Sequence, residues 1–193
     1  MGTGHTDVLL GVLQAVSASV LVPQDVADEV GYKSTEILPY TRAASNLQGA
    51  ARRNRLAIAT HQVGDDEVLD RWVSKLFGFP RAEVAHRAKD LGETMAVAHA
   101  AALREHGERV VVVVDDGGGQ RLTNQHGLDF ISSLTVLGKA ALLGLVPDRA
   151  TMTSVYADIS RHSKGLPAID DPIVQSRLFA DTVLYGSQAD RLT

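Results

Sequence analysis

The chain has 193 residues, 45% of them hydrophobic, a size that supports one well-buried core, so we expect a single domain over residues 1–193. Cysteine is absent, which excludes disulfides, thiolate metal sites and thiol catalysis. The formal net charge of -4 argues against a protein that coats nucleic acid through charge alone.

Membrane insertion and secretion are not expected. The longest apolar runs, such as Val110–Val114, are far below the roughly 18 residues that a membrane-spanning helix needs. The first residues lack a positive segment followed by an apolar core, so no secretory signal is visible. We therefore expect a cytoplasmic protein without a membrane partner.

Hydrophobic periodicity in the first half of the chain predicts helices that alternate with short strands. Helices are expected over residues 7–16, from residue 24 to about 30, and over 65–77, where Gly78 ends the last one. The segment 42–55 is rich in good helix formers. Strands are expected over residues 19–23 and 56–60.

The middle of the chain contains the most apolar strand. A short helix is expected over residues 81–89, followed by an alanine-rich helix from about 90 to 106 that Gly107 closes. Residues 109–114 include five successive valines. Such a run is typical of a central parallel strand that helices cover on both faces, and a turn at Asp115–Gly119 is expected to end it.

The last third is predicted to be mainly helical. A short strand at residues 129–132 precedes expected helices at 134–143, 148–162 and 172–185. Alternating strands and helices with a valine-rich central strand predict a three-layer α/β/α sandwich around a mainly parallel sheet. Residues from about 134 to 193 would form a helical C-terminal extension of that domain.

Asp115 and Asp116 are the first candidate site residues, because they follow the valine strand. In parallel sheets, binding sites form beyond the C-terminal ends of the strands. Two adjacent carboxylates can bind a hard divalent cation, and the glycines after them leave room for a substrate. The alternative is a plain turn, since aspartate and glycine are also the residues that tight turns require.

Glu93 and Glu29 are further candidates for the same site. Glu93 begins the alanine-rich helix, although its spacing from Asp90 is also that of a capping box, in which it would serve only its own helix. Glu29 follows the strand at residues 19–23 and, considered alone, is an ordinary helix glutamate. Carboxylates that follow two different strands, with one at a helix start, could converge on a metal ion.

Other common site motifs are absent from the sequence. The seven histidines show no H-E-x-x-H spacing, which excludes a zincin site. Gly117–Gly119 is not followed by Lys-Ser/Thr and lacks dinucleotide-binding spacing, and no nucleophile elbow is present.

Four sequence blocks resemble those of one family. Residues 20–30, 91–100, 110–122 and 134–147 look like successive blocks of bacterial PIN-like proteins, in the same order and with similar spacing. The resemblance covers most of the chain outside residues 32–90. It implies the PIN-like sandwich fold and a metal-dependent endoribonuclease.

The resemblance also implies a site and partners. PIN domains hold Mg²⁺ or Mn²⁺ with about four acidic residues and cut RNA, and many are toxins that an antitoxin protein neutralises. By position, Glu29 resembles the second acid, Glu93 the third, and Asp115 or Asp116 the fourth. In this family, the metal activates a water molecule and stabilises charge on the phosphate.

The chain departs from the family at its start. The family begins with an apolar strand that ends in the first metal-binding aspartate, and no such strand precedes Asp7. Residues 4–10 resemble instead the helix start that follows that strand, so a late start site or a natural loss of the strand would explain the difference. The sheet would then have an unpaired edge, unless the valine strand or a second subunit, as in a homodimer, covers it.

Two rival hypotheses remain open at the level of sequence. One is a non-catalytic PIN-like module that binds RNA or a protein, through the basic segment from Arg42 to Arg55. A solvated helix face is the plainer explanation of that segment. The other rival is a Mg²⁺-dependent phosphohydrolase that uses Asp115 and Asp116.

Overall fold

The computed structural model describes residues 5–16, 19–36, 40–80, 82–84, 91–161, 165–180, 183 and 185. These residues form a mixed α/β protein in which every described strand pair is parallel, as predicted. None of the helices in the described ranges is long and apolar enough to cross a membrane.

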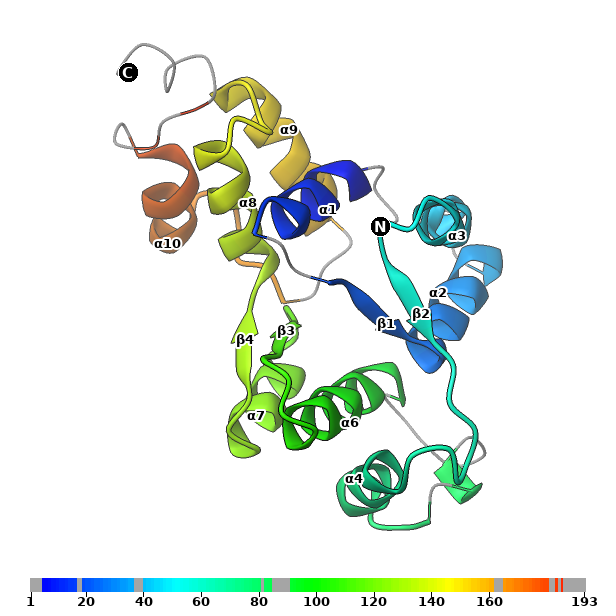
Figure 1. The fold of residues 1–193 in the computed structure, drawn as a ribbon. Coiled ribbons are helices and arrows are strands. Elements are labelled where there is room, and N and C mark those ends of the chain that lie inside the picture. The colour runs from blue at the N-terminus through cyan, green and yellow to red at the C-terminus, as the bar shows by residue number, and fades with distance from the viewer. Residues whose placement is uncertain are drawn as a thin grey trace.

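The N-terminal elements pack around the first strand pair (Figure 1). They are α1 (Thr6–Ala15), β1 (Leu21–Pro23), α2 (Gln24–Glu36), α3 (Ala43–Arg52) and β2 (Ala57–Ala59). β1 pairs with β2 in register Val22 to Ile58. Leu10, Leu47 and Leu56 are buried between these elements, because each amphipathic helix turns its apolar stripe to the same core.

Among the described helices and strands, the alanine-rich helix α6 (Leu91–Glu105) has the most buried residues. It contacts α2, α4 (Glu67–Phe77), α7 (Gly117–Gln125), β1 and β3 (Val111–Val113). Asp66 caps α4 by accepting hydrogen bonds from the N–H groups of Val68 and Leu69 at 2.9 and 3.1 Å, and Gly78 ends α4 in the left-handed conformation. Leu69 and Val73 then pack against Met95 and Ala98 of α6.

The second strand pair is β3 (Val111–Val113) with β4 (Asp129–Ile131), joined through α7 (Gly117–Gln125). Helices α8 (Ser133–Leu142), α9 (Arg149–Ser160), α10 (Pro172–Val174) and the π-helical turn η2 (Gln175–Phe179) follow. With α1 they enclose a separate core around Tyr156, whose hydroxyl donates to the carbonyl of Pro167 at 2.8 Å. The described part of the chain after residue 132 therefore contains helices joined by turns and irregular segments, without a strand.

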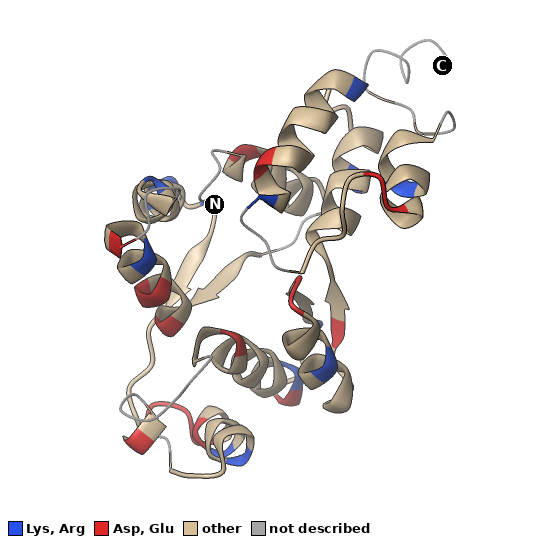
Figure 2. Ribbon diagram, turned by 180° about the vertical axis from the view of Figure 1, so that it is seen from behind, with Lys and Arg blue, Asp and Glu red and all other residues tan. Residues whose placement is uncertain are grey.

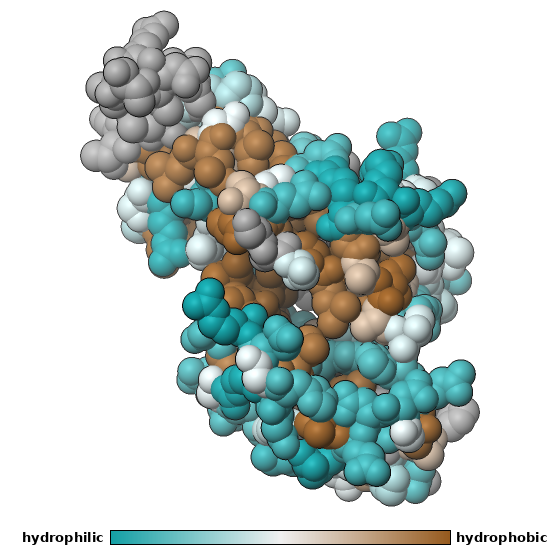
Figure 3. Space-filling view, viewed as in Figure 1, coloured by the Kyte–Doolittle hydropathy of each residue, from teal (hydrophilic) through white to brown (hydrophobic). Residues whose placement is uncertain are grey.

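The described strands form two two-stranded sheets rather than one continuous central sheet. Figure 1 shows α6 beneath both pairs, in agreement with its contacts to β1 and β3, and Figure 3 shows a hollow with hydrophobic walls over this region. Leu21, Val111 and Val113 direct their N–H groups away from their own partner strands, and among the described residues no hydrogen bond is recorded from them. Among the described residues, β1 and β3 therefore each have an unpaired backbone edge.

The prediction that the valine strand is buried on both faces was wrong. Val112 is 7% exposed and packs on α6, whereas Val111 and Val113 are 53% and 41% exposed. Alternate residues of a strand point to opposite faces, and α6 covers only one face of β3. Valine favours extended backbone whether or not it is buried. The run of valines therefore predicted a strand but could not show which of its faces is buried.

Two further predictions needed correction. Residues 117–119 begin helix α7 instead of forming an open turn, because Asp116 provides an N-cap and Gly119 allows a close approach to Val114. The last helix ends at Phe179 rather than near Tyr185. Of the helix predicted at 81–89, only residues 82–84 are described, and they are helical. Asp90 lies outside the described residues.

A matched pair of substitutions tests the one-sided burial of β3. Val112→Thr is expected to lower the free energy of unfolding by about 1–2 kcal/mol, because it buries a hydroxyl. Val113→Thr keeps the branched shape at an exposed position and is expected to cost less than about 0.5 kcal/mol. Urea denaturation measures both. Equal losses would mean that another segment covers Val113 in solution.

Acid is expected to weaken the cap of α4. Burial alone would raise the pKa of Asp66, but hydrogen bonds from Leu69, His106 and Val68 outweigh it and lower the pKa below the ordinary 3.8. A lowered pKa in the folded state contributes stability above the unfolded value, and this contribution disappears as pH falls through the folded value. Asp66→Asn retains a cap that does not titrate. The difference in unfolding free energy between the two proteins should be largest above about pH 5 and vanish in stronger acid.

Candidate functional site

Glu29 lies on α2, where it faces the start of α6. Its Oε1 accepts from Lys33 Nζ at 2.5 Å, and the side chain is half-buried. Its Oε2 occupies the space beside Gly92, in the first turn of α6, so closely that a methyl group at Gly92 would overlap it. The absence of a side chain at Gly92 therefore brings this carboxylate to the positive end of the α6 dipole.

Glu93 repeats this arrangement one helix further along. It is exposed in the first turn of α6, and its Oε2 lies 3.3 Å from the position that a Cβ of Gly119 would occupy. Gly119 is in the first turn of α7. The Glu93 carboxylate is thus placed against the N-terminal turn of α7, where negative charge is favoured.

Asp115 follows β3, as predicted, but its carboxylate is held by α8. Oδ1 accepts from the N–H of Ser133 at 2.7 Å, and Oδ2 accepts from the Ser133 hydroxyl at 2.6 Å. Ser133 is the first residue of α8. Both oxygens of Asp115 therefore join the end of β3 to the N-terminus of α8. A carboxylate held in this way does not support the hypothesis of a phosphohydrolase that uses Asp115.

Asp116 is the N-cap of α7. Its Oδ1 accepts from the N–H of Gly118 at 2.6 Å, and the residue is exposed. Gly165, from the segment that follows α9, lies against the backbone of Asp115 and Asp116 so closely that no larger residue would fit. The turn between β3 and α7 is therefore held by the cap at Asp116 and by packing against Gly165.

The four predicted carboxylates share a region without forming one ligand group. Glu29 lies against the first turn of α6, Glu93 against that of α7, and Asp116 at the cap of α7, whereas Asp115 turns toward α8. Within the described ranges, no three His, Asp or Glu side chains are grouped so that they could hold a metal ion. All four are oxygen donors, the chemistry that Mg²⁺ and Mn²⁺ prefer, but they are not assembled as a coordination sphere.

The sequence did not reveal three residues that shape this region. Gly92 and Gly119 admit the glutamates, and Ser133 holds Asp115. The Ser132-Ser133 pair before an apolar helix was a helix-start signal. The approach of glycine to a distant glutamate has no local sequence signal, because it depends on how the helices pack.

Comparison of the chain with models of known protein families, with curated proteins and with solved structures finds no match. The PIN-like resemblance therefore remains a prediction based on the sequence blocks.

Removal of the Asp115 carboxylate is expected to destabilise the fold more than removal of Asp116. Asp115→Ala loses two charge-assisted hydrogen bonds in a half-buried place and should cost about 2 kcal/mol. Asp116→Ala loses one exposed cap and should cost about 1 kcal/mol. Ser133→Ala, which keeps the backbone donor, should fall near the smaller value. Urea denaturation of the three variants gives the order, and an Asp115→Ala loss below about 0.5 kcal/mol would contradict this role.

Proposed function

We propose that this chain is a PIN-like protein that cuts RNA with Mg²⁺ or Mn²⁺. One observation carries the proposal: Glu29, Glu93 and Asp116, which come from α2, α6 and the start of α7, follow one another across the adjoining first turns of α6 and α7. These are the acidic positions that the sequence resemblance selects. Residues far apart in the chain are therefore near neighbours in the fold.

In this proposal Glu29, Glu93 and Asp116 would hold the metal, and Asp115 would join them once its carboxylate turns from Ser133 to the metal. A bound divalent cation supplies an activated water and stabilises phosphate charge. The protein's own contribution is to orient the carboxylates. The first turns of α6 and α7 favour negative charge beside them, and Lys33 would release the Glu29 carboxylate when a cation binds.

The proposal extends to the fold and to partners. We propose that β1–β2 and β3–β4 are two halves of a PIN-like sheet whose central strand would lie between them, within a three-layer sandwich. An antitoxin protein is proposed from the resemblance, a homodimer from the unpaired strand edges, and a cytoplasmic location from the pattern of the sequence.

A non-catalytic RNA- or protein-binding module is the second candidate. It is favoured by the engagement of Asp115 with Ser133 and of Asp116 with Gly118. Carboxylates that stabilise helix starts need no metal to explain their positions. This module would bind its partner equally well with or without a chelator.

The proposal is tested by titration of the chain with Mg²⁺ or Mn²⁺ in a calorimeter, with RNA cleavage assayed in the same samples. Glu93→Gln with Asp116→Asn removes two ligand charges at little change in shape, and we expect it to abolish both metal binding and cleavage. The structure offers a matched control in Glu108→Gln with Asp129→Asn, which removes the same charge at exposed positions outside this region. That control should retain both properties.

Three results are informative. Binding and cleavage that only the site variant loses would support the nuclease. Metal binding without cleavage would favour an incomplete site. If the unmodified chain binds no metal but binds RNA in the presence of chelator, the nuclease proposal fails and the non-catalytic module replaces it.

A further inference from the structure

One segment of this acidic chain is free of acidic residues. Residues 37–64 contain four arginines and no Asp or Glu, although the whole chain has 23 acidic residues and a net charge of -4. The residues outside this segment therefore have a more negative net charge than the chain as a whole. Such segregation of charge along a chain produces a local positive field that the net charge conceals.

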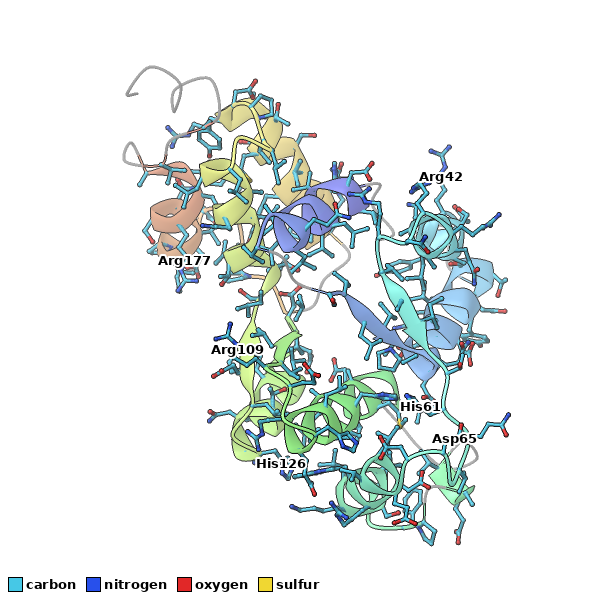
Figure 4. All side chains as sticks on the ribbon, viewed as in Figure 1. Arg42, His61, Asp65, Arg109, His126 and Arg177 are labelled. Carbon is cyan, nitrogen blue, oxygen red and sulfur yellow. The ribbon has the colours of Figure 1, made fainter. Side chains whose placement is uncertain are left out.

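Helix α3 places most of this charge on one face. Ala43, Leu47 and Ala50 are buried against the core, so the opposite face of the helix is turned to solvent. That face carries the exposed Arg42, Arg52 and Arg53, with the exposed Ser45 and Gln48 between them. Figure 2 shows the basic residues gathered on this helix, and Figure 4 shows Arg42 pointing away from the body of the protein.

The cations of this region differ in whether they are already paired. Arg55 forms an ion pair with Asp7, and Lys33 forms one with Glu29. No ion pair of Arg42, Arg52 or Arg53 is recorded within the described ranges, even though the neighbouring helix α2 is rich in acidic residues. The three arginines on the exposed face of α3 are thus available to an external anion.

The dimensions and chemistry of this face fit a repeating phosphate. From Arg42 to Arg52 the helix rises by roughly 15 Å, which is about four phosphates along one stacked strand. Guanidinium groups bind phosphate through paired N–H donors, and short hydroxyl and amide side chains such as Ser45 and Gln48 are common backbone contacts. No large hydrophobic side chain is exposed on α3, so the face lacks the apolar anchors of a membrane-binding helix or a protein hot spot.

We infer that the exposed face of α3 is a docking surface for the phosphate backbone of a nucleic acid, bound through Arg42, Arg52 and Arg53 without base recognition. The inference does not depend on the carboxylate region or on metal. It concerns a separate helix, and it stands whether or not the chain cuts RNA.

The test is fluorescence anisotropy with a labelled single-stranded RNA of about 12 nucleotides, titrated with the full chain in EDTA at several salt concentrations. We expect the triple variant Arg42→Gln, Arg52→Gln, Arg53→Gln to bind at least about 10-fold more weakly. The slope of log affinity against log salt should become about 2 smaller, since each lost phosphate contact on a single strand removes about 0.7. The corresponding triple lysine variant should retain most of the binding and of the slope.

A second triple variant controls for net charge. Arg109→Gln, Arg161→Gln and Arg177→Gln remove three arginines from other parts of the molecule, and Figure 4 shows Arg109 and Arg177 far from Arg42. This variant should bind like the unmodified chain. The inference is overturned if both triple variants lose affinity equally, if the α3 variant binds RNA unchanged, or if only anionic vesicles or polyglutamate compete for α3. Circular dichroism confirms that the variants fold, and because EDTA is present throughout, a failure here is distinct from a failure of the nuclease proposal.

Discussion

Helix α6 packs closely against five other elements of the fold, and their positions follow from this packing. This helix contacts α2, α4, α7, β1 and β3, which is possible because Ala98, Ala100, Ala101 and Ala102 are buried with little side-chain bulk. Small residues let neighbouring backbones approach, and each contact buries apolar surface of the partner. The two strand pairs do not hydrogen-bond to each other, so α6 is the element that joins them.

The same packing gives the acidic residues their positions. Glu29 meets α6 beside Gly92, Glu93 meets α7 beside Gly119, and Asp115 meets α8 at Ser133. In each case a carboxylate from one element lies at the N-terminal turn of a later helix, where the dipole and unpaired N–H groups favour negative charge. This arrangement stabilises the folded protein, and it also brings the oxygen atoms of several carboxylates into one region. Carboxylates beside helix N-termini can stabilise the fold and can also bind a cation. The geometry is therefore compatible with both the nuclease and the non-catalytic module.

Charge and exposed apolar surface are separated in this molecule. The cationic face of α3 lacks exposed hydrophobic residues, whereas β1 and β3 expose Leu21, Val111 and Val113 beside unpaired backbone edges. Parallel strands are normally covered on both faces, and a two-stranded pair has little stability of its own. The described helices supply that cover on one side only. The strand edges therefore suit an apolar or strand-forming partner, whereas the α3 face suits an anionic one.

Most of the local structure could be predicted from the amino-acid sequence, because helix periodicity, caps and breakers act within a few residues. The sequence predicted α1, α3, β1, β2, α4, α6 and α9 closely, and it placed Asp115 after a strand. It did not predict α7, where three glycines looked like a turn until the cap at Asp116 and the contact with Val114 were known. Burial of the valine strand, the division of the strands into two pairs, and the direction of the Asp115 side chain were decided only by tertiary structure. Each depends on which distant element packs against a residue, and local sequence patterns carry no information about that contact.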